Sequence, residues 1–525
     1  MEHVRVLDCT LRDGGYCNNW EFGWKNIRKI IQKLVDAKLD IVECGFLTNK
    51  VEYDREKTQF TELGQIQDVI GNKAPDCTYV AMINYGEYDV ENLKQYDGKS
   101  VDGIRIAFHK KDIDGALDCC RKIKQKGYKV FVQPMVTLNY SDEEFISLIK
   151  QCNDLTPYAF YIVDSFGVMK EHDLTRLYYL VEHNLKKEVY IGYHSHNNMQ
   201  LAYSNAQKLV NINGTRKLII DTSVMGMGRG AGNLNTELFL EYLNNCFVDR
   251  YKISPLLTLI DEIIDGFYQK KYWGYSLPNY LSAKHNAHPN YAIYLNEKQT
   301  LTVEAMDQIF SIMSEEKRVY YDEQYIGELY TMYMTKGGVN EARLQNLRDA
   351  LNGKRVLVIA PGKSVAEEEN KILKYSEKED IVTISVNFKC PYVCEDYIFV
   401  SNMRRYQELP PNSLQHTIVT SNIDTEDVFL KISYPSLFNS IEAVKENAGM
   451  MMLEFLMQLG IKDVLVAGMD GYSYDVESNY AQKNLQMNVN KEQIRKWNTG
   501  MEQAIKKFQE IMKIKSVTKE KYIHI

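Results

Sequence analysis

Three residues far apart in the chain could together hold a divalent metal ion. Asp13 lies in the run Thr10–Gly15 (TLRDGG), and His194 and His196 lie in the run His194–Asn197 (HSHN). Two imidazoles and one carboxylate suit Mn²⁺, Mg²⁺, Fe²⁺, Co²⁺ or Zn²⁺ and leave coordination positions open for substrate and water. Histidines two residues apart on a strand point the same way, so both can face one site.

Two further features belong to this candidate site. Arg12 places a permanent cation beside Asp13, where it could bind a substrate carboxylate and stabilise an enolate. A structural salt bridge is the alternative role for Arg12. The segment Gly226–Asn233 (GMGRGAGN) provides a polar, glycine-rich loop, but it lacks the spaced glycines of a dinucleotide-binding fingerprint.

The first 240 residues alternate short β-branched runs with amphipathic stretches, which predicts repeated βα units. Eight such units predict a TIM (β/α)8 barrel, whose active site lies at the C-terminal ends of the strands. The predicted strands are Val4–Asp8, Asp40–Gly45, Cys77–Ile83, Gly103–Phe108, Lys129–Met135, Ala159–Asp164, Val189–His194 and Lys217–Thr222. The predicted helices between them include Trp24–Ala37, Ala116–Lys126, Asp142–Cys152, Glu171–Asn184 and Ala202–Asn211.

The polar motifs fall where a barrel active site needs them. Arg12 and Asp13 follow the first predicted strand, Glu43 lies near the end of the second, and Asp164 ends the sixth. The two histidines close the seventh strand, and the glycine-rich loop follows the eighth. Polar residues at the ends of several strands on one face of a barrel indicate catalysis.

In this order, the motifs resemble the DRE-type TIM-barrel metallolyase (HMGL-like) superfamily, which includes HMG-CoA lyase, isopropylmalate and homocitrate synthases and 4-hydroxy-2-oxovalerate aldolase. The aldolase branch is the most similar. The resemblance rests on Thr10–Gly15, Glu43–Phe46, Asp164–Gly167, His194–Asn197 and Gly228–Asn233. It covers residues 1 to about 240 and implies metal-assisted cleavage or formation of a C–C bond through an enolate.

The resemblance implies a metal site in this chain. Asp13, His194 and His196 would be the ligands. Asn233 would be a further ligand or a group that contacts one of these ligands. Mn²⁺ and Mg²⁺ are the preferred ions, with Zn²⁺ and Co²⁺ as alternatives.

The resemblance also implies catalytic roles. Arg12 would bind the ketone and enolate oxygens, and Ser165 would hydrogen-bond the pyruvyl carboxylate of a 2-oxo acid. Glu43 would orient Arg12 or a metal-bound water. A retro-aldol step would then release an aldehyde and leave a pyruvate enolate.

One residue departs from the aldolase pattern. The aldolase branch has a histidine, its catalytic base, two residues after Asp-Gly, where this chain has Tyr16. A phenol has an ordinary pKa of about 10 and is a poor base at neutral pH, so Tyr16 could act as an acid, or the proton could move through water. His285 and His288 could supply acid or base groups from a later segment, although a structural role for them is the favoured interpretation.

A second α/β module is predicted from residue 353 onward. Strand-like runs followed by tight turns predict a Rossmann-like doubly wound sheet. Pro361–Ser364 (PGKS) follows the first of these strands, but Leu357 stands where a P-loop needs its first glycine, so that motif is absent. The predicted strands are Arg355–Ala360, Ile381–Val386, Asp396–Val400, Thr417–Thr420 and Asp463–Gly468.

This second module resembles the sialyltransferase-like and motility-associated (DUF115) glycosyltransferases. The resemblance implies a nucleotide or nucleotide-sugar ligand at the strand ends, near Gly362, Ser364, Asn387 and Asp470. A scaffold or oligomerisation domain without a nucleotide is the alternative.

Length and composition set the broad organisation. The chain of 525 residues is too long for one core, so we expect a barrel domain at 1–245, a helical extension at 246–352 and the second module at 353–525. Within the extension, helices are predicted at Ser254–Lys270, Thr302–Ser314 and Asp322–Thr335. A formal net charge of −7 argues against a nucleic-acid partner. We expect a cytoplasmic protein without a membrane span, which could form a homo-oligomer.

The leading hypothesis is a metal-dependent aldolase or lyase acting on a 4-hydroxy-2-oxo acid, working in the synthesis of a surface polysaccharide sugar. One alternative is a Claisen-type synthase that joins acetyl-CoA to a 2-oxo acid. Another is a barrel that serves as a scaffold for a glycosyltransferase-like C-terminal domain. The intact set of Arg12, Asp13, His194 and His196 argues against the scaffold.

Overall fold

The computed structural model describes residues 3–212, 216–247, 249–298, 300–335, 340–486 and 491–525. The chain divides into two compact units. Unit 1 comprises Met1–Ile293 with Ser314–Tyr321, and unit 2 comprises Tyr294–Met313 with Asp322–Ile525. The residues of the predicted helical extension are therefore divided between the two units. The predicted domain boundaries remain predictions.

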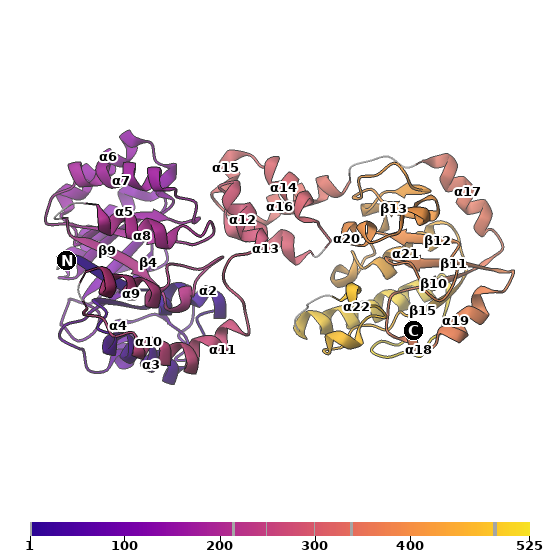
Figure 1. Ribbon diagram of the computed structural model, residues 1–525, viewed down its shortest axis with the longest axis horizontal. Helices are drawn as coiled ribbons and strands as arrows, with labels where there is room; N and C mark the ends of the chain where they lie inside the picture. Colours follow the sequence, from indigo (N-terminus) through magenta and orange to yellow (C-terminus); the bar gives the residue numbers. More distant parts are fainter. Residues whose placement is uncertain (1–2, 213–215, 248, 299, 336–339, 487–490) are drawn as a thin grey trace. The chain divides into compact units, whose positions relative to one another are not determined.

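Unit 1 contains a closed barrel of eight parallel strands, as the sequence predicts (indigo to magenta in Figure 1). The strands pair in the order β1-β9-β8-β7-β6-β5-β4-β2, and pairing of β1 with β2 closes the ring. A two-residue strand that the sequence did not predict, β3 (Gln59–Phe60), pairs with β2. The barrel strands are β1 (Val4–Asp8), β2 (Ile41–Leu47), β4 (Thr78–Asn84), β5 (Gly103–Phe108), β6 (Lys129–Pro134), β7 (Ala159–Asp164), β8 (Tyr190–Ser195) and β9 (Leu218–Thr222).

Amphipathic helices alternate with these strands. In α3 (Trp24–Asp36), Ile27, Ile30, Ile31 and Leu34 recur at helical spacing and are buried in the main apolar core. Burial of such apolar faces fixes each strand in register and thereby places the loops at its C-terminal end. The other helices of this ring are α4 (Leu63–Ile70), α5 (Ile113–Gln125), α6 (Asp142–Leu155), α7 (Glu171–Asn184), α8 (Ala202–Asn211) and α9 (Thr236–Cys246).

The predicted helix at Ser254–Lys270 is present but interrupted. It consists of α10 (Ser254–Leu259), a π-helical turn at Ile260–Ile264 and α11 (Asp265–Tyr268). A π turn inserts one residue into the helical repeat and therefore rotates the following side chains. The remaining helices of unit 1 include α1 (Thr10–Asp13), α2 (Gly15–Asn18), α12 (Leu277–Lys284) and α15 (Glu315–Arg318), while α13 (Pro289–Glu297) extends from unit 1 into unit 2.

Unit 2 contains a seven-stranded sheet in which every pairing is parallel (orange and yellow in Figure 1). The order β14-β13-β12-β11-β10-β15-β16 runs outward in both directions from β10, so the sheet is doubly wound as predicted. The strands β14 and β16 are additional to the prediction. The seven strands are β10 (Arg355–Ile359), β11 (Ile381–Val386), β12 (Tyr397–Val400), β13 (Thr417–Thr420), β14 (Leu430–Ile432), β15 (Asp463–Ala467) and β16 (Lys513–Ser516).

Helices accompany this sheet and precede it in the chain. The predicted helices at Thr302–Ser314 and Asp322–Thr335 are confirmed as α14 (Val303–Ser311) and α16 (Glu323–Met334). The others are α17 (Glu341–Leu351), α18 (Ser364–Glu367), α19 (Glu369–Ser376), α20 (Met403–Gln407), α21 (Ala448–Gln458) and α22 (Lys491–Gln509). Across the described residues, no helix combines the length and the apolar character that a membrane crossing requires.

Candidate functional site

Asp13, His194 and His196 meet at the C-terminal end of the barrel. Asp13 ends α1, directly after β1, and the two histidines lie at the end of β8. All three are buried, and one potential ligand atom from each lies within 4.8 Å of the others. The local sequence explains this placement, because residues two apart on a strand face the same side.

In each imidazole, Nδ1 contacts an oxygen of the protein, so Nε2 remains as the potential metal ligand. Nδ1 of His194 lies 3.0 Å from a carboxylate oxygen of Asp221 in β9. Nδ1 of His196 lies 3.3 Å from the carbonyl oxygen of Asp164. Burial lowers the pKa of His194 to about 4, so this ring is neutral at neutral pH. Neutral imidazoles whose Nδ1–H is bound by an acceptor are the form that ligates metals.

Asp13 is held as a carboxylate. Burial by itself would raise its pKa, but Arg12 and then His196 outweigh that effect and keep the pKa well below the ordinary value. Arg12 forms an ion pair with Asp13, and Nδ2 of Asn233 donates to the same carboxylate at 2.6 Å. A short antiparallel bridge between the backbones of His196 and Asn233 ties the glycine-rich loop to the end of β8.

Two buried acceptors in this cluster have no hydrogen-bond partner. They are Oδ1 of Asn233, the amide that donates to Asp13, and Nε2 of His196, which lies 3.5 Å from Oδ2 of Asp13. Buried polar atoms are almost always satisfied, so orphaned acceptors beside a carboxylate need an explanation. Nitrogen and oxygen donors of this kind fit a divalent cation.

A buried charge network supports the cluster. Nε of Arg12 donates to Glu43 at 2.9 Å, and Nη1 of Arg105 lies 2.9 Å from the same Glu43 oxygen. Arg105 also forms an ion pair with Asp221, and the hydroxyl of Tyr161 donates to Asp221 at 3.0 Å. The side chains of all these residues are almost fully buried.

Arg105, Tyr161 and Asp221 were not among the residues predicted to form the site. A signal was present, since Arg105 interrupts the apolar strand Gly103–Phe108 and Asp221 interrupts Leu218–Thr222. An ionic residue inside a buried barrel strand requires a partner on a neighbouring strand.

A cavity of about 280 Å³ opens beside the cluster. Arg12, Asp13, His194 and His196 line it, and so do Tyr16 and Ser165. Glu43 is not among the lining residues and lies against Arg12 instead. The hydroxyl of Ser165 accepts the backbone N–H of Val136 at 2.9 Å, which fixes its position.

Two residues that the sequence analysis did not assign to the site also line this cavity. Arg229 of the glycine-rich loop lies over the ring of Tyr16, with its Cζ 4.5 Å from the ring centroid. His288 enters from the segment between α12 and α13, and its Nε2 lies 3.2 Å from Nη1 of Arg229. Burial, and then Arg229, lower the pKa of His288 to about 3. His288 thus lines the site, whereas the lining residues do not include His285.

Unit 2 has a cavity of about 330 Å³ of its own, at the C-terminal ends of β10, β11, β12 and β15. Gly362, Asn387 and Asp470 line it, whereas Ser364 is not among the lining residues and contacts Asp470 instead. Both the N–H and the hydroxyl of Ser364 donate to the Asp470 carboxylate. Burial raises the pKa of Asp470.

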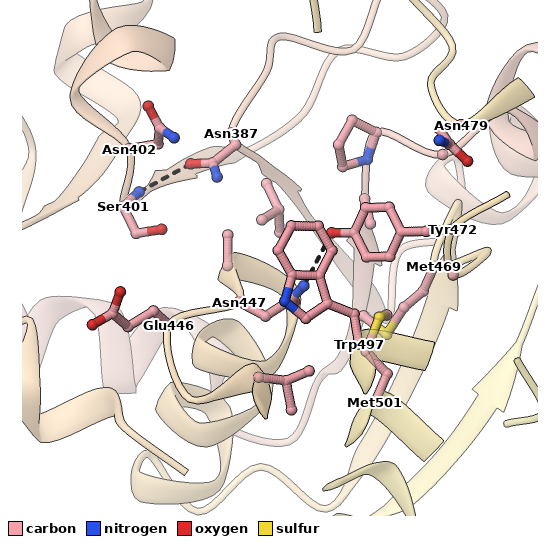
Figure 2. A pocket seen from close by; sticks show the side chains of 18 of the residues that line it. Asn387, Ser401, Asn402, Glu446, Asn447, Met469, Tyr472, Asn479, Trp497 and Met501 are labelled. Atoms are coloured by element: carbon pink, nitrogen blue, oxygen red, sulfur yellow. Dashed lines mark hydrogen bonds between the residues drawn. The ribbon is translucent and has the colours of Figure 1, made fainter. Parts of the chain in front are cut away.

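Aromatic and amide side chains form much of the wall of this second cavity. In Figure 2 the indole of Trp497 lies next to Tyr472 and Asn447, while Asn387 and Ser401 lie on another side. The rings of Trp497 and Tyr472 are 5.0 Å apart, and Nδ2 of Asn447 donates to the Tyr472 hydroxyl at 3.2 Å. Trp497 and Asn447 were not predicted to belong to this site, because neither lies in a recognisable motif.

Comparison with known proteins identifies relatives of unit 1. Residues 3–251 match the HMGL-like family model. A 4-hydroxy-2-oxovalerate aldolase from Geobacillus thermodenitrificans is 26% identical over 269 residues, which are 50% of this chain and 75% of that protein. A 4-hydroxy-2-oxovalerate aldolase from Bacillus cereus is 25% identical over 279 residues, 50% of this chain and 80% of that protein.

One similar solved structure is the N-terminal domain of a "putative aldolase" from Bacteroides vulgatus. The two sequences are 27% identical, and the aligned region covers 56% of this chain and 96% of the solved domain, with a TM-score of 0.48. The N-terminal part of the chain is thus similar to the HMGL-like family.

Proposed function

We propose that unit 1 is a divalent-metal-dependent lyase that cleaves or forms a C–C bond of a 4-hydroxy-2-oxo acid through a pyruvate enolate. The orphaned acceptors of His196 and Asn233 beside Asp13 carry this proposal. The HMGL-like match and the aldolase relatives support the reaction class.

The chain offers a suitable set of ligands for the metal. Asp13, His194, His196 and Asn233 would hold the cation, and a site of oxygen and nitrogen donors suits Mn²⁺, Mg²⁺, Co²⁺ or Zn²⁺. When bound, the cation polarises the 2-oxo group and so favours the enolate. Asp221 orients His194, and the Asp164 carbonyl orients His196.

Arg12 supplies a fixed cation to the substrate oxygens. Its Nε contacts Glu43 and its Nη1 contacts Asp13, whereas its Nη2 is buried without a hydrogen-bond partner. A preorganised donor of this kind stabilises negative charge that develops on an oxygen without a cost of reorganisation. Ser165 would bind the pyruvyl carboxylate.

Tyr16 is the proposed proton-transfer group. Its ring lines the cavity and packs against Trp20, with the ring centroids 4.8 Å apart. His288 lines the same cavity, but an imidazole with a pKa of about 3 is a weak base at neutral pH. Its proposed part is to pack beside Arg229 as a neutral ring.

The test is an assay of pyruvate release from a series of 4-hydroxy-2-oxo acids, run with each divalent cation and with a chelator. We expect cation-dependent release in the wild type and a loss of at least about 100-fold in Arg12→Met. Thiol release from acetyl-CoA with a 2-oxo acid would instead support the Claisen-type synthase. Absence of both activities with every cation would favour the scaffold.

For unit 2 we propose a nucleoside-binding site. The cavity lies where the strand order reverses, at the C-terminal ends of the strands, which is where doubly wound sheets bind ligands. The exposed face of an aromatic such as Trp497 can stack on a base, and the carboxamides of Asn387 and Asn447 can bind base edges or ribose hydroxyls.

The phosphates of a nucleotide would add little binding free energy in this cavity. The first turn after β10 is the usual phosphate position, but the Asp470 carboxylate already takes the N–H of Ser364 there. Each cation of the wall is also paired, because Lys298, Arg405 and Lys445 contact Glu446, Glu408 and Glu442, respectively.

Titration calorimetry with uridine, cytidine, adenosine, guanosine and their 5′-diphosphates tests the nucleoside site. We expect one nucleoside to bind, and we expect the Kd of its diphosphate to lie within a few-fold of the Kd of the nucleoside. Trp497→Ala should raise both Kd values at least about tenfold. Tyr474→Ala removes an exposed aromatic outside the cavity and serves as the control. A diphosphate more than about tenfold tighter than its nucleoside, or no binding at all, would contradict the proposal. The surface-polysaccharide role, the cytoplasmic location and a homo-oligomer stay predictions.

A further inference from the structure

Arg229 brings a positive charge into the barrel cavity, and no ion pair among the described residues joins it to Asp13, Glu87 or Asp112, the carboxylates that line this cavity. Its guanidinium stacks on the ring of Tyr16 and contacts a nitrogen of His288, which is a neutral group. Its Nε is buried and has no hydrogen-bond partner.

The other two arginines near the site are in a different situation. Arg12 forms ion pairs with Asp13 and Glu43, and Arg105 forms ion pairs with Glu43 and Asp221. Within the described parts of the chain, Arg229 forms no ion pair. Arg229 therefore lines this cavity without a carboxylate in direct contact with its guanidinium.

The observed contacts do not account for Arg229 by themselves. A cation over an aromatic ring gains less free energy than a buried charged donor without a partner costs. The positive charge also disfavours protonation of His288, which is part of the reason for the low pKa of that ring. An additional acceptor, supplied by a ligand, would satisfy Nε and balance the charge.

The loop that carries Arg229 is fixed in advance. The N–H of Ala231 donates to Oδ1 of Asn198, and the N–H of Asn197 donates to the carbonyl oxygen of Gly232, both at 2.8 Å. Gly230 has a φ of +66°, and a Cβ there would lie 2.7 Å from Asn198 Oδ1. Only glycine fits this turn without strain, so the guanidinium is presented from a rigid support.

We propose that Arg229 binds an anionic group, a phosphate or a carboxylate, on the aldehyde portion of the substrate. This inference rests on the proposed lyase function, in which Arg12 and Ser165 take the pyruvyl end. The substrate class is then a 4-hydroxy-2-oxo acid whose carbon chain ends in a second oxyanion. A planar guanidinium with a free Nε matches either oxyanion through two parallel hydrogen bonds.

Matched aldehydes test this assignment in the direction of synthesis, with pyruvate and a divalent cation. Glycolaldehyde phosphate is compared with glycolaldehyde, and succinic semialdehyde with butanal. In the wild type we expect kcat/KM to be about 10- to 100-fold higher for an anionic aldehyde than for its neutral match. The pair with the larger ratio identifies phosphate or carboxylate as the natural group.

Two variants separate recognition from folding. Arg229→Met should lower kcat/KM for the anionic aldehyde about 10- to 100-fold more than for the neutral one, and Arg229→Lys should give an intermediate ratio. Arg55→Met is the matched control, because Arg55 also stacks on an aromatic ring, Trp24, but lies outside the cavity. Equal ratios in wild type and Arg229→Met would overturn the proposal.

A binding experiment keeps this inference separate from the lyase proposal. Ethyl phosphate and propionate are titrated calorimetrically into the full chain and into Arg229→Met. If no aldehyde reacts but one anion binds at least about tenfold more weakly to the variant, the anion site stands and the lyase proposal fails. If aldehydes react without preference and neither anion depends on Arg229, the lyase proposal stands and the anion site fails.

Discussion

Nε2 of His196 and Oδ1 of Asn233 connect this chain most directly to metal chemistry, because both are buried acceptors without a hydrogen bond and Nε2 lies 3.5 Å from a carboxylate oxygen of Asp13. The residues that form the cluster could be predicted, since Asp13, His194 and His196 lie in short local motifs. Their support from Arg105 and Asp221 could not be predicted as easily. Each is a single polar residue on a different strand, and only the closed barrel shows that they pair.

The first residue-scale prediction concerns Asp221. Asp221→Asn removes the charge that orients His194 and leaves Arg105 without one of its partners. We expect metal affinity to fall about 10- to 100-fold and the free energy of unfolding to fall by about 3 kcal/mol. Titration calorimetry with Mn²⁺ and urea denaturation measure the two effects.

Asp102→Asn provides the control for this change. Asp102 forms an ion pair with Lys73 at the opposite end of the barrel and also accepts the N–H of Tyr79. This variant should lose stability while Mn²⁺ affinity stays at the wild-type value. Equal Mn²⁺ affinities in Asp221→Asn and the wild type would show that His194 does not need this orienting contact.

The second residue-scale prediction concerns pH. The folded-state pKa of His288, about 3, is below the ordinary value of about 6.5, so the unfolded chain takes up the proton first. Stability contributed by neutral His288 is therefore complete above pH 6.5 and is lost as pH falls toward 3. We expect His288→Asn to shrink the difference in unfolding free energy between pH 8 and pH 5 by about 1–2 kcal/mol.

Urea denaturation at the two pH values measures this difference. His172→Asn is the control, because the His172 side chain is 76% exposed. A His288→Asn variant with the same pH dependence as the wild type would mean that His288 is not buried as a neutral ring.

The elements that carry the site could largely be predicted because their sequence patterns are strong. All eight barrel strands are runs of buried β-branched and apolar residues, and α7 (Glu171–Asn184) has the predicted bounds. The strands β3 and β14 could not be predicted as readily, since they have only two and three residues. The strand β16 has four residues, like the predicted β12 and β13, but two of them are lysines. Strands this short have no clear alternation, and pairing with a neighbour defines them.

The glycine-rich loop makes the prediction at the scale of elements. A Cβ on Gly228 would overlap Nδ2 of Asn233 and would lie 2.7 Å from Oδ2 of Asp13. We expect Gly228→Ala to displace both side chains and to weaken Mn²⁺ binding at least about tenfold, with the far-ultraviolet circular dichroism unchanged.

Gly64→Ala is the matched control in α4. A Cβ at Gly64 meets no atom within 4 Å, and alanine favours a helix over glycine by about 1 kcal/mol. This variant should be at least as stable as the wild type and should bind Mn²⁺ normally. Wild-type Mn²⁺ affinity in Gly228→Ala would show that the loop tolerates the displacement.

The whole molecule combines two α/β units, each with its own parallel sheet and its own cavity. The two classes of sheet could be predicted from alternating strand and helix patterns. The division of the segment between them could not, because long-range contacts decide it: Ser314–Tyr321 joins unit 1, while Tyr294–Met313 joins unit 2. Periodicity in one sequence does not report such contacts.

Two separate cores predict two thermal transitions in scanning calorimetry. A divalent cation at about 100 times its Kd should stabilise only unit 1, by about 2.7 kcal/mol, and the nucleoside should shift only the other transition. Asp13→Asn should abolish the shift caused by the cation and leave the other transition unchanged. A single transition that both ligands shift alike would contradict independent units.

Deuterium exchange into the methyl group of pyruvate tests the central claim most directly, because it needs no knowledge of the aldehyde partner. Proton NMR follows the methyl signal in D₂O with the wild type, with each divalent cation and with a chelator. We expect exchange that depends on the cation and is lost in His196→Ala. Absence of exchange with every cation, or equal exchange in His196→Ala, would contradict a metal-dependent enolate at this site.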